Sequence, residues 1–225
     1  MPTLTKDGVI WTLRLDEGEN RFTPAFLDFA HDALDDIAAS TEPTALVTVG
    51  TEKFFSNGLD LEWVLGNVEK LPRYVDRIHA LFAKVLTLPV PTVAAVNGHA
   101  FGGGAMLALA HDFRVMRSDR GFFCFPEADI DIPFTEGMNA LIQAKLTPQA
   151  QVATMTTGRR FTGPEAQALG IVDALAEVDD LLASATALVE PLAGKKRSTL
   201  GSIKQVMFAR ATRALTTPAP DDLKL

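Results

Sequence analysis

Cysteine and long apolar stretches are what this sequence has least of. Cys124 is its one cysteine, so no disulfide can form within the chain, and the flanking phenylalanines predict a buried thiol in a reducing compartment. No run of about 18 apolar residues occurs, so no membrane-spanning helix is expected. The N-terminus, Met1 to Asp7, lacks the apolar segment of a signal peptide. We therefore expect a cytoplasmic protein with no membrane partner.

Positive charge is also scarce. The 21 lysines and arginines are outnumbered by 28 aspartates and glutamates, which gives a formal net charge of −7 and a pI near 5.1. Nucleic-acid binding needs a basic face, so no nucleic-acid partner is expected. Apolar residues are plentiful, at 47% of 225 residues, which is enough for one sizeable core and one main domain.

Histidine, a common catalytic residue, occurs only four times. His31 and His79 fall within helical patterns and have no acidic or cysteine partner at metal-ligand spacing. His99 lies in a glycine-rich loop and His111 ends the helical pattern after it, with no nucleophile beside either. The sequence contains neither Gly-x-Ser-x-Gly nor His-Glu-x-x-His. We expect neither a catalytic histidine nor a bound metal.

Glycines gather in the stretch from Pro91 to His111, which changes periodicity in its middle. Residues 92–96 form a short apolar run that predicts a strand buried on both faces. Three consecutive glycines, residues 102–104, then open a helical pattern. Without side chains, the unpaired N–H groups of this first helical turn are accessible at the positive end of the helix dipole. We expect an anionic or polarised oxygen to bind there.

Two well-known glycine-loop sites do not fit this stretch. A P-loop requires Gly-Lys-Ser/Thr after the last glycine, and Ala105 and Met106 stand there instead. A dinucleotide-binding fingerprint requires a glycine where Leu107 stands. Taken alone, the glycines are equally well explained by close packing of a helix on a strand.

A second stretch, Lys53-Phe-Phe-Ser-Asn-Gly-Leu-Asp60, favours a ligand site. It too follows an apolar strand run, residues 45–49, and leads into a helical pattern. Two strand-to-helix turns of this kind can direct two backbone amides at one oxygen. This is the arrangement of an oxyanion hole.

Phe55-Ser-Asn-Gly-Leu-Asp60 followed by Asn97-Gly-His-Ala-Phe-Gly-Gly-Gly104 resembles the enoyl-CoA hydratase/isomerase (crotonase) family. The likeness spans residues 9–172 and is greatest to peroxisomal Δ3,Δ2-enoyl-CoA isomerases of the plant type. It implies a coenzyme A thioester as substrate, no further cofactor, and an oxyanion hole formed by Leu59 and Gly103. The substrate contacts that it implies are Ser56, Asn57, Gly58, Asp60, Gly102 and Met106.

The order of the predicted elements gives an α/β fold. Strands are predicted at residues 9–15, 45–49, 92–96, 113–116 and 122–125. Helices are predicted at residues 24–39 and 73–88, from Thr147, from Thr162 with a capping box, and from Val178 onward. The resemblance, and not the periodicity, implies that these elements form a crotonase-like spiral of strand-strand-helix turns with a C-terminal helical extension.

The resemblance divides the chain into a spiral core, residues 1–194, and a C-terminal helical oligomerisation segment with a tail, residues 195–225. It implies a homotrimer or hexamer. The tail after Leu215 is expected to be frayed. We interpret the basic cluster at residues 195–197 as charge complementarity at a helix end, with a coenzyme A phosphate contact as the alternative. The last three residues, Leu-Lys-Leu, resemble a peroxisomal address without its small first residue, so the peroxisomal matrix is the alternative localisation.

The candidate acids and bases follow the second glycine turn. In the resembling enzymes a Pro-Glu pair places a glutamate at the substrate, which corresponds to Glu127. Yeast and animal peroxisomal isomerases use a glutamate in a later Thr/Pro-Glu-Gly, which corresponds to Glu136. Both remain candidates, beside the interpretation that they are exposed loop acids. Asp129 and Asp131 alternate with isoleucines and predict a strand edge with exposed acids.

Met106 is the main departure from the family pattern. Hydratases of the family carry a second glutamate at this position, because hydration needs one carboxylate to activate water and another to handle the proton at C2. Methionine can do neither, which favours a one-base reaction. We therefore consider an isomerase that moves a double bond in an acyl-CoA, another acyl-CoA reaction such as hydration or thioester hydrolysis, and a non-catalytic acyl-CoA-binding protein.

Overall fold

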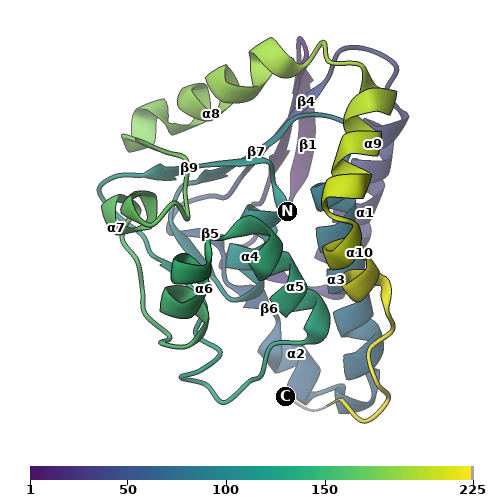
Figure 1. The fold of residues 1–225 in the computed structure, drawn as a ribbon, viewed down its shortest axis with the longest axis vertical. Helices are drawn as coiled ribbons and strands as arrows, with labels where there is room; N and C mark the ends of the chain where they lie inside the picture. Colours follow the sequence, from purple (N-terminus) through teal and green to yellow (C-terminus); the bar gives the residue numbers. More distant parts are fainter. Residues whose placement is uncertain (224–225) are drawn as a thin grey trace.

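A computed structural model describes residues 1–223, and its main feature is a six-stranded sheet (Figure 1). The strand order is β1-β2-β4-β7-β9-β11. The strands are β1 (Thr3–Asp7), β2 (Ile10–Arg14), β4 (Ala45–Val49), β7 (Thr92–Val96), β9 (Phe113–Arg117) and β11 (Ala174–Ala176). β1 and β2 are antiparallel, and every other neighbouring pair is parallel.

A smaller parallel sheet lies beside the large one, with strand order β10-β8-β5. Its members are β5 (Phe54–Ser56), β8 (His99–Phe101) and β10 (Phe123–Cys124), and a further pair is formed by β3 (Arg21–Phe22) and β6 (Gly58–Leu59). Strands β4, β7 and β9 of the large sheet are each followed by a strand of the small sheet and then by a helix: α2 (Leu61–Leu65), α4 (Gly103–Ala110) or α5 (Glu136–Lys145). This repeat is the predicted spiral of strand-strand-helix turns.

The remaining helices are α1 (Pro24–Ala39), α3 (Leu71–Thr87), α6 (Pro148–Met155), α7 (Gly163–Ala168), α8 (Leu181–Val189), α9 (Arg197–Met207) and α10 (Ala209–Thr216), with 3₁₀ turns at Val68–Lys70, Val178–Asp180 and Glu190–Leu192. Three of them, α1, α6 and α7, begin at the predicted threonine caps. The Thr23 and Thr147 hydroxyls accept the N–H groups of Phe26 and Ala150, and Thr162 opens its helix with a capping box. No helix in the described part of the chain is long and apolar enough to cross a membrane.

Both faces of the large sheet are covered, which explains why β4 and β7 are buried along their whole length and are mainly apolar. On one face, Val47 of β4 and Val93 of β7 pack in one apolar cluster with Leu181 and Val189 of α8. The alternate side chains of β4 and β7 lie on the opposite face, in the main core with α1, α3 and α4 (Figure 1).

The C-terminal helices pack against the rest of the chain. Phe208, Ala211 and Leu215 belong to the main core, and α10 contacts α3 and α5 (Figure 1). Arg197, from the basic cluster, donates to the Ile37 and Ala38 carbonyls at 2.9 and 2.8 Å, so it binds the C-terminal end of α1. This is charge complementarity at a helix end, as predicted, but at the end of a helix distant in sequence.

Two local predictions are wrong. Residues 127–131 form turns and not a strand edge, because the Asp129 and Ile130 N–H groups both donate to the Pro126 carbonyl, although Asp129 and Asp131 are exposed as expected. The tail is not frayed as far as Leu223, since the Ala219 N–H donates to Asp76 Oδ1 at 2.7 Å. The Lys and Leu that end the possible peroxisomal address lie outside the described residues.

Candidate active site

The first element of the site is the turn between β6 and α2. Ser56 stabilises this turn, because its hydroxyl donates to the Asn20 carbonyl at 2.6 Å and accepts the Gly58 N–H at 3.1 Å. Gly58 has φ +75°, and a β-carbon placed on it would lie 2.7 Å from the Gly103 nitrogen. Only glycine satisfies both constraints, so the absence of a side chain brings this turn against the second one.

The second element is the turn between β8 and α4. Gly102 has φ +50°, and Gly103 is the first residue of α4, whose N–H has no partner within the helix. A β-carbon on Gly104 would overlap the Ser56 carbonyl oxygen, which shows how closely the two turns pack. Leu59 and Gly103 both line one cavity. The two turns that the sequence singles out therefore meet at a common space.

Glu127 is the third element, and it enters the same cavity from the turn after β10. Its side chain points toward the glycine turn, because a β-carbon on Gly102 would lie 3.3 Å from Glu127 Oε1. The residue is 8% exposed, and Oε2 has no hydrogen-bond partner within residues 1–223. Desolvation in this apolar setting raises the pKa of the carboxyl to about 7. Such a group can accept and release a proton near neutral pH.

The cavity has a volume of about 210 Å³ and is lined mainly by apolar side chains. Its lining consists of Arg21, Asn57, Leu59, Leu61, Val75, Phe101, Gly102, Gly103, Pro126, Glu127, Ile130, Ile132, Pro133, Thr135, Met138 and Leu223. Within the described chain, Glu127 is the one carboxylate among these residues. The arrangement places one buried carboxyl group beside two backbone turns in a mainly apolar cavity.

The other predicted contacts divide between the cavity and its support. Asn57 lines the cavity, whereas Ser56 lies behind it as described above. Asp60 caps α2 by accepting the Trp63 N–H at 3.3 Å and does not line the cavity. Met106 is fully buried in the main core and is also outside the lining. The structure therefore gives no substrate contact to Ser56, Asp60 or Met106 through this cavity.

Glu136 lies outside this cavity as well. It is the first residue of α5, it is exposed, and it lines a separate hollow with residues of α10 and the tail. Thr135, immediately before it, caps α5 and does line the cavity. At the start of α5, Thr135 therefore faces the cavity, whereas Glu136 faces away from it.

The four histidines lie apart from the cavity lining. His111 is fully buried: its Nδ1–H donates to the Leu107 carbonyl and its Nε2 accepts the Thr48 hydroxyl, each at 2.8 Å. Burial lowers its pKa to about 3, so it stays neutral. His79 is also buried, against Thr135, and His99 packs among phenylalanines.

A larger groove, of about 560 Å³, lies between α9 and the β7 and β9 ends of the large sheet, and its polar side chains Asp112, Lys145 and Lys204 are already paired. Asp112, the carboxylate in its described lining, accepts a hydrogen bond from the Lys204 ammonium at 2.6 Å and one from the Thr92 N–H at 2.9 Å.

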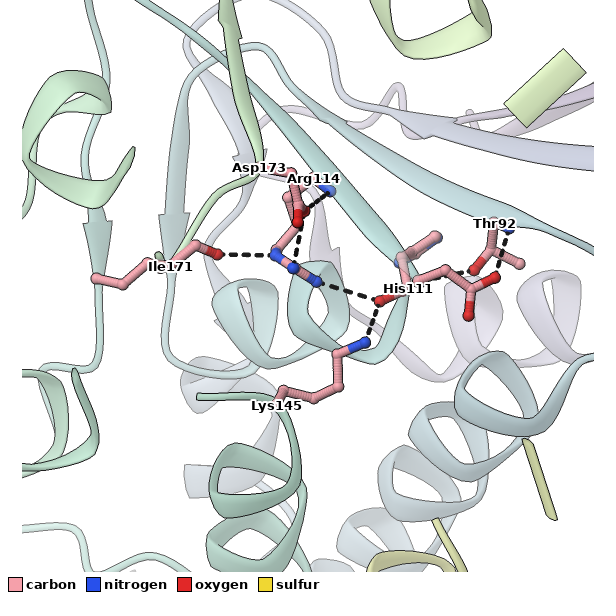
Figure 2. Close-up of polar contacts among 7 residues, drawn as sticks. Thr92, His111, Arg114, Lys145, Ile171 and Asp173 are labelled. Carbon is pink, nitrogen blue, oxygen red and sulfur yellow. Dashed lines mark hydrogen bonds and ion pairs between the residues drawn. The ribbon is translucent and has the colours of Figure 1, made fainter. Parts of the chain in front are cut away.

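Figure 2 shows the adjoining network, in which Arg114 and Lys145 both donate to the His111 carbonyl. Burial lowers the pKa of Lys145 to about 8. We interpret this network as structural, because it ties β7 and β9 to α5 and α9. Lys195 and Lys196 also line this groove and not the Glu127 cavity.

Sequence reasoning missed Arg21 and Leu223 as lining residues. Arg21 lies on a two-residue strand that pairs with Gly58, and its guanidinium binds Glu19 at 2.6 Å. Glu19 in turn accepts the Asn57 amide at 3.0 Å, and these bonds to Arg21 and Asn57 lower the Glu19 pKa. The one feature of the sequence that indicated a turn near Arg21 was the polar segment before it, residues 16–20. Leu223 was considered only as the first residue of the Leu-Lys-Leu that resembles a peroxisomal address.

Two strand-to-helix turns and one buried carboxyl thus surround an apolar cavity in an α/β fold, an arrangement typical of an enzyme active site. A profile of the enoyl-CoA hydratase/isomerase family matches residues 5–225, and the chain belongs to that family. It is 38% identical to enoyl-CoA delta isomerase 3 of Arabidopsis thaliana over 205 residues, and the aligned part covers 87% of this chain and 86% of that protein. Its identity to the peroxisomal enoyl-CoA delta isomerase 2 of the same plant is 35%, over 97% of this chain and 99% of that protein.

Other relatives carry other activities in their names. Carnitinyl-CoA dehydratase of Salmonella typhi is 34% identical over 92% of this chain and 79% of that protein. Among solved structures, a probable enoyl-CoA hydratase of Mycobacterium tuberculosis matches with a TM-score of 0.88 and 26% identity, over 95% of this chain and 91% of that one. The crotonase fold is therefore established, and the family of the chain is that of acyl-CoA enzymes.

Proposed function

We propose that this protein is a Δ3,Δ2-enoyl-CoA isomerase that uses a single glutamate base. The observation that carries the proposal is the position of Glu127: buried, with Oε2 unpaired within the described chain, in the cavity that Leu59 and Gly103 also line. The identity to plant enoyl-CoA delta isomerases supports the same reaction.

In the proposed reaction the thioester oxygen accepts the Leu59 and Gly103 N–H groups. The C2 proton of a 3-enoyl-CoA is acidified by both the thioester and the neighbouring double bond. Glu127 takes this proton, and the negative charge of the resulting dienolate falls on the thioester oxygen. Glu127 then returns the proton at C4, which gives the 2-enoyl-CoA. Each amide donor of such a hole contributes about 2.7–4 kcal/mol to catalysis.

Glu127 is the first choice as base and Glu136 the second. Glu127 lines the cavity, whereas Glu136 is exposed at the start of α5 and lines a different hollow. The raised pKa of Glu127 suits a base that must also give its proton back.

Hydration is the second candidate, because a relative named as a dehydratase matches the chain, and the Mycobacterium tuberculosis protein is named a probable hydratase in one solved structure and an isomerase in another. Against it, no second carboxylate accompanies Glu127 in the lining formed by residues 1–223, and the position that would carry it is the buried Met106. Thioester hydrolysis and non-catalytic acyl-CoA binding remain the further alternatives. We propose no cofactor besides the coenzyme A of the substrate.

The test is a comparison of two substrates with the purified protein. We expect conversion of a 3-enoyl-CoA to the 2-enoyl-CoA, and little 3-hydroxyacyl-CoA from a 2-enoyl-CoA. Hydration of the 2-enoyl-CoA at an ordinary enzymatic rate would instead support the second candidate. Binding of acyl-CoA without turnover of either substrate would support the non-catalytic alternative.

The compartment is proposed separately. We propose the cytoplasm, with the peroxisomal matrix as the alternative that the names of two plant relatives favour. Imaging of a fluorescent protein fused to the N-terminus, which leaves the C-terminal Leu-Lys-Leu free, separates the two.

A further inference from the structure

The C-terminal tail, defined here as residues 217–223, forms part of the wall of the Glu127 cavity. Leu223 is half-buried and lines the cavity with Val75 of α3 and Met138 of α5. It is the last residue that the structure describes, more than 80 residues after Met138 in the sequence. An apolar side chain on a chain end is therefore in direct contact with the space that would receive the substrate.

A second hollow lies on the other side of this wall. It has a volume of about 290 Å³ and is lined by His79, Thr135, Glu136, Gly137, Ala214, Thr217, Pro218, Ala219, Pro220 and Leu223. Leu223 and Thr135 are common to the cavity and the hollow. These two residues are thus the partition between the two spaces.

The two halves of the partition are held with different strength. Thr135 is fixed three times: it caps α5 by accepting the Met138 N–H, its hydroxyl bonds His79 Nε2 at 2.9 Å, and its backbone carbonyl accepts the Asn139 N–H. Apart from the bonds of Thr217 to the Arg213 carbonyl at the end of α10, one hydrogen bond links the tail to the rest of the described residues, the bond from the Ala219 N–H to Asp76 of α3. Judged by hydrogen bonds, Leu223 is the less firmly held half of the partition.

The tail sequence keeps this segment from continuing α10. Pro218 and Pro220 cannot donate to a helical carbonyl, so the helix ends at Thr216 and the chain turns toward α3. The Leu223 N–H then donates to the Pro220 carbonyl at 3.0 Å, which closes a turn and directs the leucine inward. Asp221 and Asp222 within the turn are exposed.

We propose that the C-terminal tail sets the length of acyl chain that this protein accepts, with Leu223 as the specificity-determining residue and Asp76 as the residue that positions it. A short acyl chain fits the cavity with the tail in place. A longer one requires the space behind Leu223, which becomes available only when the tail moves. This inference rests on the proposed acyl-CoA function, but it does not depend on which glutamate is the base.

The experiment measures the dissociation constants of saturated acyl-CoA esters of 4 to 16 carbons by calorimetry, with wild type, Leu223→Ala, Asp76→Ala and a chain that ends at Thr217. Each additional methylene that becomes buried strengthens binding about fourfold. In the wild type we expect this gain to stop at a chain length set by Leu223. In the three variants the gain continues for two or more carbons, so the longest esters bind on the order of tenfold tighter than to wild type, while the shortest esters change little.

Asp222→Ala is the matched control, because it removes an exposed side chain from the same tail and should reproduce the wild-type dependence on chain length. The three variants act by different routes, so one that fails to fold leaves the other two. An unchanged length dependence in the variants that fold would overturn the inference while leaving acyl-CoA binding intact. Absence of acyl-CoA binding at every length in the wild type would overturn both it and the proposed function. A changed length dependence in a protein without isomerase activity would contradict only the proposed isomerase reaction.

Discussion

Glu127 has the environment of a base that works near neutral pH. Its pKa is raised to about 7 by desolvation, so the carboxylate that must accept the C2 proton is lost as the pH falls through that value. For 3-enoyl-CoA isomerisation, kcat/KM should therefore decrease about tenfold per pH unit below about pH 7 and be level above it. A pH–rate profile checks this. A rate that stays level down to pH 5 would show that the ionising base is not this buried carboxyl.

Met106 is the residue that separates the two candidate reactions. Met106→Glu returns an acid to the position that hydratases of the family use, so we expect hydration of 2-enoyl-CoA to appear above the wild-type level. The site is fully buried in the main core, and an unpaired charge there costs stability, so the melting temperature should fall. Met106→Gln, of similar size and without the acid, is the control. Equal hydration by the glutamate and glutamine variants would contradict the assignment.

At the scale of the elements, the two glycine turns carry the proposed oxyanion hole. Gly103 is the first residue of α4, a position where proline is well tolerated, and Gly103→Pro removes the N–H in question. Gly103→Ala keeps the N–H and adds a β-carbon 2.9 Å from Leu59 Cδ1, so it reports the steric effect alone. We expect the proline variant to have a kcat about 10²–10³-fold below that of the alanine variant. Equal rates of the two variants would remove the Gly103 amide from the mechanism.

The same scale separates what the sequence could predict from what it could not. Helix starts at Thr23, Thr147 and Thr162 depend on capping bonds within a few residues, so local reading was sufficient. The two-residue strands β3 and β6 exist only because they pair with each other, and this pairing brings Arg21 to the cavity. Pairing between two-residue strands that are distant in the chain produces no periodic pattern in the sequence.

The choice between Glu127 and Glu136 was open for a related reason. Both follow the second glycine turn, and the resemblance offered both. The turn in which Asp129 and Ile130 bond to the Pro126 carbonyl, together with the start of α5, turns Glu127 inward and leaves Glu136 outside. That difference depends on three-dimensional packing that single-sequence patterns do not contain.

At the scale of the whole molecule, the outer face of α9 suggests self-association. Ile203, Val206 and Met207 are 55%, 80% and 62% exposed, and Ile203 and Met207 also line the groove of about 560 Å³. A contiguous exposed apolar surface of this kind is typical of an interface. We therefore propose the homotrimer or hexamer that the resemblance implies, with a mass three or six times the 24.2 kDa of the chain.

Light scattering after size exclusion measures that mass directly. Val206→Glu should lower it toward that of the monomer, because a charge would be buried in the contact. Leu65→Glu, at a residue that is 78% exposed on α2, is the matched control and should leave the mass unchanged. A monomeric wild type would contradict the proposed interface.

The central claim is that one buried glutamate moves the proton, and single glutamine substitutions test it most directly. With 3-enoyl-CoA as substrate, Glu127→Gln should lower kcat about 10²–10⁴-fold, because the loss of a positioned general base has this effect. Glu136→Gln should leave kcat close to that of wild type. Melting temperatures and acyl-CoA binding, measured in parallel, show that both variants fold. The account is contradicted if Glu127→Gln isomerises the substrate as fast as wild type, or if activity is lost only in Glu136→Gln.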